Sequence, residues 1–273
     1  MAKTKPERRQ RADEAAAVPA GARTGGRIAK LLARAGLCSR REAERWIAEG
    51  RVAVNRVVLT SPAVNVAPGD IVTVNGKPLP DIEPARLWRY HKPKGLVTTH
   101  KDPEGRPTVF ERLPESLGHL LSVGRLDLAS EGLLLLTNDG ALARHLELPA
   151  TGWLRRYRVR VHGHPTQAEL ARLSDGLEVA GVRYGPIEAR LDRARGANAW
   201  LTVALREGKK REVRRILEAL GFPVLRLIRI AYGPFQLGAL AQGQLDEVPR
   251  KVLREQLGPF LAQLESGHAH RRR

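Results

Sequence analysis

Residues 124–140 read Gly-Arg-Leu-Asp-Leu-Ala-Ser-Glu-Gly-Leu-Leu-Leu-Leu-Thr-Asn-Asp-Gly. The four consecutive leucines at 133–136 form a short apolar run bounded by turn residues, and this pattern predicts a central, buried strand. Asp127 lies in the polar loop before that strand, with glycines on both sides that allow a ligand to approach closely. A loop aspartate more often closes a turn or caps a helix, and Ser130 and Glu131 share the loop. Spacing alone therefore leaves the role of Asp127 open.

The segment from about 87 to 249 carries mainly strand patterns around this motif. Alternating or short apolar runs predict strands at 87–90, 95–99, 120–123, 156–161, 199–205 and 224–231. Helical signals predict helices at 141–147, after a capping Asp139, and at 212–220. Because strands outnumber helices without alternating regularly with them, the sequence predicts an α+β fold. We expect a mixed, mostly antiparallel sheet with flanking helices.

A smaller unit precedes this segment. From Arg27 onward, apolar residues spaced three and four apart predict a helix that ends at Gly36. Ser39, with Glu42 three residues later, predicts a capping box at the start of a second helix. Short valine-rich runs and an Asn75-Gly76 hairpin turn follow. This order predicts a compact helix–turn–helix plus hairpin unit.

Composition divides the chain into four expected segments. Residues 1–25 mix basic residues with Ala, Gly and Pro without periodicity, which is typical of a disordered basic arm. We expect the small unit to be a domain over 26–82 and the strand-rich region to be a domain over 86–250. A helix and a basic tail over 251–273 complete the chain, and prolines near 78–84 indicate a linker between the two domains.

The charge of the chain indicates a polyanionic partner. There are 47 basic and 29 acidic residues, for a formal net charge of +18, and most of the basic residues are arginine. Self-repulsion on this scale works against a compact fold, so an enzyme of small metabolites would not need it. Arginine matches phosphate with two parallel hydrogen bonds and stacks on bases, which favours nucleic acid. A high-GC genome explains part of the arginine excess over lysine but not the net charge.

Several classes of function have no support in the sequence. The single cysteine, Cys38, cannot form an internal disulfide or a cysteine zinc site, and it fits a reducing cytoplasm. The histidines are scattered without metal-ligand spacing, so we expect no metal site. Glycine-rich nucleotide motifs are lacking, so we expect no cofactor. No apolar stretch approaches the roughly 18 residues of a membrane span, so we expect no membrane association.

Two basic clusters are candidate nucleic-acid contacts. The first lies on the predicted two-helix corner, and the second surrounds the predicted helix at 212–220, whose N-terminal amides also favour an anion. A solvated helix face is the plainer explanation for either cluster. The candidate RNA-binding residues are Arg27, Arg34, Arg40, Arg41, Arg45, Arg125, Lys209, Lys210, Arg211 and Arg215.

Three stretches together resemble the ribosomal RNA pseudouridine synthases. Residues 124–140 are similar to the signature of that family, and residues 207–215, Glu-Gly-Lys-Lys-Arg-Glu-Val-Arg-Arg, resemble its second conserved stretch. Residues 226–233, Arg-Leu-Ile-Arg-Ile-Ala-Tyr-Gly, resemble the third. The small N-terminal unit is similar to the RNA-binding domain called S-four, in the order that this family uses. The resemblance covers roughly residues 26–250.

The resemblance implies roles for four residues. Asp127 matches the catalytic aspartate, and Tyr157 matches the tyrosine that stacks on the target base. Arg214 matches the basic residue that pairs with the aspartate, with Arg211 and Arg215 as alternatives. Leu227 matches the aliphatic residue that packs under the ring. The family more often has lysine before the tyrosine, where this chain has Arg156.

The implied reaction is isomerisation of uridine to pseudouridine in ribosomal RNA, which needs no cofactor. The second and third stretches most resemble the large-subunit branch, so we expect 23S rather than 16S RNA as substrate and a cytoplasmic monomer as the active form. Such enzymes have been assigned either attack by the aspartate on the sugar or proton abstraction, and the sequence does not choose between them. The alternatives are an inactive RNA-binding homologue that assists ribosome assembly and, less well supported, a helix–turn–helix DNA-binding protein.

Overall fold

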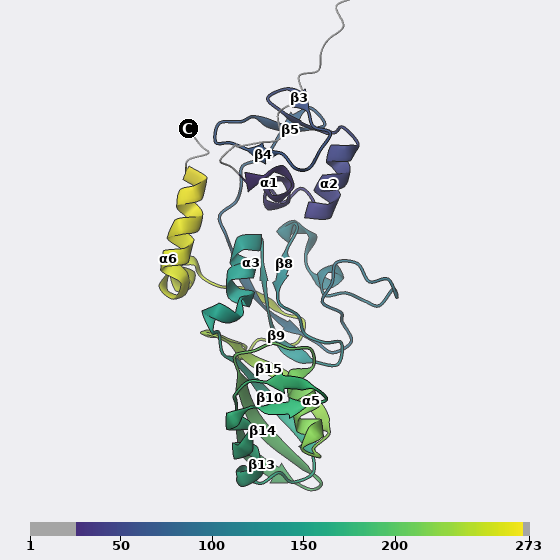
Figure 1. Ribbon diagram of the computed structural model, residues 1–273, viewed down its shortest axis with the longest axis vertical. Helices are drawn as coiled ribbons and strands as arrows, with labels where there is room; N and C mark the ends of the chain where they lie inside the picture. The colour runs from purple at the N-terminus through teal and green to yellow at the C-terminus, as the bar shows by residue number, and fades with distance from the viewer. Residues whose placement is uncertain (1–25, 270–273) are drawn as a thin grey trace, which may run out of the picture. The chain divides into compact units, whose positions relative to one another are not determined.

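The computed structural model describes residues 26–269, with side chains up to residue 264 (Figure 1). The expected basic arm at 1–25 and the end of the expected basic tail lie outside the described residues. The chain divides into two compact units, Met1–Glu83 with Gly267–Arg273 and Pro84–Ser266.

The first unit has two helices and a small antiparallel sheet. Its elements are β1 (Gly26–Arg27), α1 (Ile28–Arg34), α2 (Arg40–Ala48), β2 (Val52–Val54), β3 (Val57–Val58), β4 (Asn65–Val66), β5 (Val72–Val74) and β6 (Lys77–Pro78). The order β3-β2-β5-β6 forms the sheet, and β1 pairs separately with β4. Ile28, Leu32, Ala43 and Ile47 from the helices pack with Val52 in a core of this unit's own.

Local signals set the helix boundaries of this unit, with one difference from the expectation. The Ser39 hydroxyl accepts a hydrogen bond from the Glu42 amide at 3.2 Å, as an N-cap should. The reciprocal half of the predicted capping box is not present, because the Glu42 carboxylate instead accepts from Arg45 at 3.0 Å. Asn75 and Gly76 both have positive φ, which is the hairpin geometry that their sequence predicts.

The second unit contains a nine-stranded sheet with helices on both faces. Its strands are β7 (Leu87–Lys92), β8 (Leu121–Val123), β9 (Glu131–Thr137), β10 (Arg155–His162), β11 (Leu177–Val179), β12 (Val182–Tyr184), β13 (Ile187–Arg195), β14 (Asn198–Leu205), β15 (Val224–Tyr232), β16 (Phe235–Gln236) and β17 (Leu245–Glu247). Its α-helices are α3 (Gly140–Glu147), α4 (Gln167–Ala171), α5 (Glu212–Ala219) and α6 (Arg250–Ala269). Short 3-10 helices occupy Phe110–Arg112, Glu115–Leu117, Pro149–Thr151 and Arg172–Asp175.

The main sheet has the order β13-β14-β10-β15-β9-β7-β17, with β8 beside β9 and β16 beside β15. All its pairings are antiparallel except that of β9 with β15, which confirms the predicted mixed, mostly antiparallel α+β architecture. Strand β9 carries the four leucines, and all seven of its residues are buried. The apolar run therefore forms the central strand that its composition predicts.

Gly132 makes the parallel contact between β9 and β15 possible. Its φ is +106°, and a Cβ atom at this position would lie 2.3 Å from the carbonyl oxygen of Arg229. Any larger residue would separate the two strands. The glycine thus fixes the loop at 124–130 beside the middle of β15.

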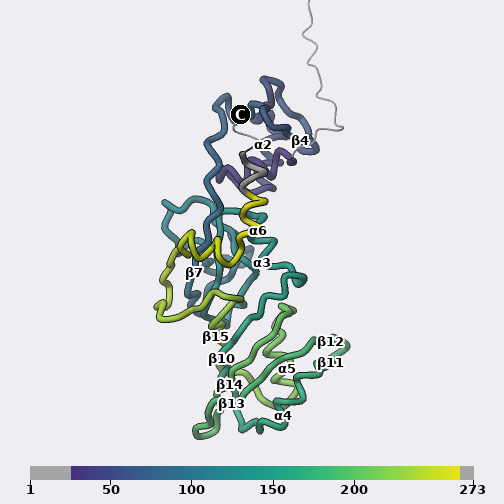
Figure 2. The backbone as a smooth tube through the Cα atoms, turned by 90° about the vertical axis from the view of Figure 1, so that its left-hand side faces the viewer, coloured from purple at the N-terminus to yellow at the C-terminus, as the bar shows by residue number. Residues whose placement is uncertain are grey.

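The helices lie on opposite faces of the two halves of the sheet. Leu142 of α3 and Leu253 of α6 pack with Leu133 and Leu135 of β9 on one face. Leu170 of α4 and Ile216 and Leu217 of α5 pack on the other face, against β10 and β14. In Figure 2, α4, α5, β11 and β12 all lie to one side of β13 and β14.

The strand predicted at 95–99 is wrong. Pro93 and Gly95, whose φ is +84°, turn the chain away from β7, and Gly95 donates its amide hydrogen to the carbonyl of Leu128 at 2.9 Å. Only an isolated bridge between Val97 and Thr108 remains in this segment. The apolar residues at 95–99 therefore belong to a loop, and this loop lies next to the loop that carries Asp127.

Candidate active site

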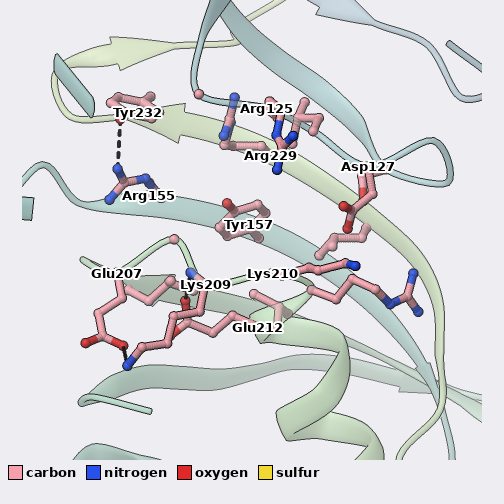
Figure 3. Close-up of a pocket in the computed structure, with 18 of the residues that line it drawn as sticks. Arg125, Asp127, Arg155, Tyr157, Glu207, Lys209, Lys210, Glu212, Arg229 and Tyr232 are labelled. Atoms are coloured by element: carbon pink, nitrogen blue, oxygen red, sulfur yellow. Dashed lines mark hydrogen bonds and ion pairs between the residues drawn. The ribbon is translucent and has the colours of Figure 1, made fainter. Parts of the chain in front are cut away.

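A pocket of about 720 Å³ opens on the face of the sheet that carries α5. Its walls come from the loop at 124–130, from β10 and β15, and from the segment that leads into α5 (Figure 3). The lining includes three of the four predicted catalytic residues, Asp127, Tyr157 and Leu227. It also includes four of the predicted RNA-binding residues: Arg125, Lys209, Lys210 and Arg211.

Asp127 faces the pocket with its carboxylate unengaged. The backbone of the loop is fixed, because the carbonyl of Asp127 accepts from the Ser130 amide at 2.9 Å. Within the described residues, the carboxylate itself has no hydrogen bond or ion pair. It is exposed and points into the pocket on the side of Lys210 (Figure 3). An exposed carboxylate that no other side chain engages is free to act on a ligand.

Lys92, which the sequence analysis did not single out, binds the backbone of this loop. It is fully buried at the end of β7, and its Nζ donates to the carbonyl oxygens of Pro93, Asp127 and Ser130 at 3.1, 3.2 and 2.9 Å. Burial lowers the pKa of Lys92 to about 8, against the opposing attraction of Asp127 and Glu131. A buried ammonium saturated by three carbonyls fixes the backbone of the loop at Asp127 itself and at Ser130, three residues later.

Arg214 does not form the direct ion pair with Asp127 that the resemblance implies. Arg214 is 6% exposed and is not part of the pocket lining. Its Nη1 donates to the carbonyl of Val224 at 2.9 Å and its Nη2 to the carbonyl of Ala129 at 3.1 Å. Burial lowers the pKa of Arg214, and the nearby charge of Asp127 acts in the opposite direction. Arg214 therefore ties α5 to the loop and acts on Asp127 through its field rather than by contact.

Tyr157 and Leu227 lie on neighbouring strands at the floor of the pocket. In the β10–β15 ladder Tyr157 pairs with Arg229, and Leu227 pairs with Val159. Tyr157 is 9% exposed, and the exposed part of the residue faces the pocket between Arg229 and Lys210 (Figure 3). An aromatic ring and an aliphatic side chain beside an open carboxylate form a surface that suits a planar base.

Arg229 and Arg155 are pocket residues that the sequence analysis did not single out. Arg229 is 2% exposed, and its Nε donates to the carbonyl of Leu133 at 2.7 Å. Its Nη2 has no hydrogen-bond partner, and no carboxylate of the described chain pairs with it. Arg155 donates to the Tyr232 hydroxyl at 2.8 Å, and both guanidinium groups lie against the Tyr232 ring. The alternation of β15, which places residues 227 and 229 on one side, was the signal that could have identified Arg229.

Glu212 forms part of the wall opposite the loop. It is 4% exposed, and its Oε2 accepts from the Lys209 amide at 2.9 Å. Burial, followed by repulsion from Glu207, raises the pKa of Glu212 to about 7. Glu207 is itself paired with Lys209 at 2.7 Å, which lowers its pKa. The wall therefore combines a carboxylate with a second carboxyl group that binds a proton near neutral pH.

The remaining basic residues of the second cluster differ in their surroundings. Arg211 precedes α5 with a φ of +54°, an uncommon conformation for a residue with a side chain, and it lies in the pocket lining. Arg215 lies one turn further along α5, outside the lining, with its Nη1 3.5 Å from the Tyr184 hydroxyl.

The basic residues of the first unit surround its two helices. Arg27 precedes α1 and Arg34 is its last residue, whereas Arg40 and Arg41 begin α2. Arg27, Arg40 and Arg41 are exposed, and Arg34 is half-buried. Arg45 is paired with Glu42 at 3.0 Å and Glu49 at 3.6 Å, so part of its charge is neutralised within the helix.

Metal-ligand clusters and helices long and apolar enough to span a membrane are both absent from the described residues. No group of three or more His, Cys, Asp or Glu side chains there is placed to hold a metal ion. No described helix combines the length and the apolar character needed to cross a bilayer.

Comparison with known proteins decides the family. A family model described as RNA pseudouridylate synthase matches residues 86–219, and one described as S4 domain matches residues 26–72. A protein of Rickettsia prowazekii named uncharacterized RNA pseudouridine synthase is 46% identical over 85% of this chain and 97% of its own length. The chain belongs to the RNA pseudouridine synthase family. The synthase is thus an isomerase that acts on RNA, as its three motifs predicted.

Other relatives place the synthase more closely. Proteins named ribosomal large subunit pseudouridine synthase B, from Pseudomonas aeruginosa and Shigella flexneri, are each 41% identical to it. The match with the Pseudomonas protein covers 86% of this chain and 63% of that protein. The match with the Shigella protein covers 84% of this chain and 82% of that protein. A solved structure described as a pseudouridylate synthase superposes with a TM-score of 0.59 at 26% identity, over 84% of this chain and 99% of its own. The similarity of the fold therefore extends over most of the chain.

Proposed function

We propose that this synthase converts a specific uridine of large-subunit ribosomal RNA into pseudouridine, with Asp127 as the catalytic group. The observation that carries the assignment is the free carboxylate of Asp127, which faces a pocket floored by Tyr157 and Leu227. The large-subunit substrate is supported by the names of relatives that are 41% identical to the synthase over the matched regions.

The reaction rearranges bonds within one nucleotide. The N1–C1′ bond breaks, the uracil rotates, and a C5–C1′ bond forms; C5 loses its proton and N1 gains one. The two routes assigned to such enzymes, attack on the sugar and abstraction of a sugar proton, both need a carboxylate that is not occupied by a partner. Asp127 meets this need because its loop is fixed through the backbone, by Lys92 and Arg214, and not through its side chain.

The pocket also offers a surface for a base that has left its stack. Flipping a uridine out of structured RNA costs a few kcal/mol. Stacking on Tyr157 offsets about 1–3 kcal/mol of that cost, and Leu227 supports the same base from β15. Both residues keep the base near Asp127 while it rotates.

We further assign Arg229 and Arg155 to the phosphate of the flipped nucleotide. A buried cation without a carboxylate partner is costly unless a ligand supplies the opposite charge. Arg229 meets this description within the pocket lining, and Arg155 lies on the same Tyr232 ring. A phosphate held at this point would fix the sugar relative to Asp127.

The test is the substitution Asp127→Asn, which keeps the size of the side chain and removes its charge. We expect pseudouridine formation on a ribosomal RNA transcript to fall by about 10⁴-fold or more, with RNA affinity nearly unchanged. Asp175→Asn, which alters an exposed aspartate outside the pocket, is the control and should keep full activity. Measurable turnover by Asp127→Asn would contradict the assignment.

The substrate and the working form of the enzyme need separate experiments. Pseudouridine mapping of ribosomal RNA, in cells with and without the gene, should reveal one lost site in the large-subunit RNA. Loss of no site would favour an RNA-binding homologue without activity. We propose a cytoplasmic monomer, since Asp127, Tyr157 and Leu227 meet within a single chain and the proposed reaction needs no residue from a second copy. Sedimentation of the purified synthase with its RNA tests the monomer.

A further inference from the structure

The sheet has a second face at β10, β13, β14 and β15 that the pocket does not use. Along β10, buried residues such as Tyr157 and Val159 alternate with exposed Arg156, Arg158 and Arg160. The buried set faces the pocket and α5, so the exposed set lies on the opposite side of the sheet. The helices α4 and α5 and the β11–β12 hairpin all lie on the pocket side (Figure 2).

This opposite side is strongly basic, and we call it the outer arginine face. The register of the strands places one set of side chains together there. The set consists of Arg156, Arg158, Arg160, Arg190, Arg193, Arg195 and Arg226, with Trp200 among them. The acidic side chains that the same register brings to this face are Glu188 and Asp192.

Most of these arginines have no charged partner. Arg190 is paired with Asp192 at 3.0 Å, and Arg226 is paired with the buried Glu131 at 2.7 Å. The other five form no ion pair with any described residue and are exposed. Their charge is therefore available to a partner.

The register brings like charges close to one another. Arg160 and Arg193 pair with Trp200 from its two sides, and Arg158 and Arg190 pair with Thr202 in the same way. Side chains two strands apart are separated by about 10 Å, which is about one Debye length at roughly 0.1 M salt, so like charges at this spacing still repel each other weakly. This repulsion is repeated across three strands, so a bound polyanion that neutralised the arginines would stabilise the sheet.

Trp200 indicates which polyanion fits. The Arg158 guanidinium lies over its ring at 4.9 Å, and the residue is half-buried within the basic face. An aromatic ring among arginines is the combination by which proteins bind single-stranded nucleic acid, since bases stack on the ring and phosphates pair with the guanidinium groups.

We propose that the outer arginine face binds a segment of the substrate RNA that flanks the nucleotides held in the pocket. The inference rests on the proposed function, because it takes ribosomal RNA as the substrate. It adds a second binding surface to the synthase domain, built on the same strands as the pocket but on their opposite face. Long RNA should therefore bind more tightly than the short target alone.

The test compares two triple variants with equal loss of charge. One carries Arg158→Gln, Arg160→Gln and Arg193→Gln. The control carries Arg172→Gln, Arg183→Gln and Arg254→Gln, which are exposed in the same unit but lie on other elements. Binding is measured against salt with two RNAs, a short stem-loop that contains the target uridine and a fragment that extends it on both sides.

We expect the outer-face variant to lower the slope of log K against log salt by about 2 on the long fragment, at about 0.7 per lost single-strand phosphate contact. Its slope on the short stem-loop should match that of the wild type, and KM should rise only for the long fragment. The control variant should match the wild type on both RNAs. This pattern would support the outer arginine face as an RNA-binding surface.

Three results would overturn the inference. An unchanged slope for the outer-face variant would show that RNA does not reach this face, and an equal effect of the control would show that net charge alone matters. The third result is binding of the wild type to phosphatidylserine vesicles that long RNA does not displace. If the outer-face variant loses this binding, the face belongs to a membrane surface. A wild-type synthase inactive on both RNAs would instead contradict the proposed function.

Discussion

Tyr157 is the residue at which stacking can be separated from polar chemistry. Its hydroxyl makes no hydrogen bond among the described residues, whereas its ring forms the floor of the pocket. We expect Tyr157→Phe to keep most of the activity and Tyr157→Leu to lose about 1–3 kcal/mol of base stacking, or roughly 5- to 150-fold in kcat/KM. Steady-state kinetics on one transcript measures both. Equal losses in the two variants would show that the hydroxyl, and not the ring, matters.

Glu212 makes the stability of the synthase depend on pH. Its pKa rises from 4.5 to about 7 on folding, mainly because of burial. The folded state therefore holds more protons than the unfolded state between pH 4.5 and 7, and stability falls as pH rises through this window. We expect Glu212→Gln to remove this fall and to stabilise the protein above pH 7 by up to about 3 kcal/mol. Urea unfolding from pH 4.5 to 8 measures it.

The control for Glu212 lies on the same helix. Glu218→Gln changes an exposed glutamate of α5 and should leave the pH dependence as in the wild type. If Glu212→Gln shows the same fall in stability between pH 4.5 and 7, a different group titrates in this window.

At the scale of single residues, the motifs identified positions but not contacts. Asp127, Tyr157 and Leu227 could be assigned to one site because the stretches that carry them resemble those of a known family, and all three line the pocket. The partner of Arg214 could not be predicted, since a long side chain on α5 can reach either a carboxylate or the nearby carbonyls of Ala129 and Val224. Which arginine lies buried without a carboxylate also depends on packing between strands that are distant in the sequence.

The loop of Asp127 depends on an anchor in another element, Lys92 of β7. Lys92→Met removes three charge-assisted hydrogen bonds to backbone carbonyls. The free energy lost with these bonds exceeds the free energy gained because a charge is no longer buried. We expect a loss of about 2 kcal/mol in the free energy of unfolding and a lower kcat with little change in RNA affinity. Thermal unfolding and single-turnover kinetics provide the measurements.

Lys94→Met is the matched control for this element. Lys94 is exposed and lies 3.9 Å from Glu131, so its removal should change stability by less than about 1 kcal/mol. A Lys92→Met protein with wild-type kcat would show that the loop keeps its position without the ammonium.

The predictability of the elements followed their pattern of burial. Strand β9 was predictable because it contains four consecutive leucines, and β10 because apolar and charged residues alternate along it. Strand β13 was missed, since most of its residues are exposed and its apolar positions are few. Residues 95–99 have strand-like composition, but their backbone groups contact the Asp127 loop and Thr108 rather than a neighbouring strand. Local composition could not reveal that difference.

At the scale of the whole molecule, each unit has a hydrophobic core of its own. The second unit should therefore fold without the first, and deleting residues 1–80 tests what the small domain contributes. We expect the shortened synthase to unfold cooperatively but to bind ribosomal RNA more weakly and with a smaller salt slope, by about 0.7 per lost single-strand phosphate contact.

Substitution separates the contribution of charge from that of the whole domain. Arg40 and Arg41 are exposed at the start of α2, and Arg40→Gln with Arg41→Gln in the full chain should reduce the slope by about 1.4 if both contact phosphates. The control is Arg56→Gln with Lys77→Gln, which removes the same charge from the exposed hairpins of the same unit. Equal slopes for the wild type and the shortened synthase would instead assign the RNA contacts to the second unit, where the pocket and the outer arginine face lie.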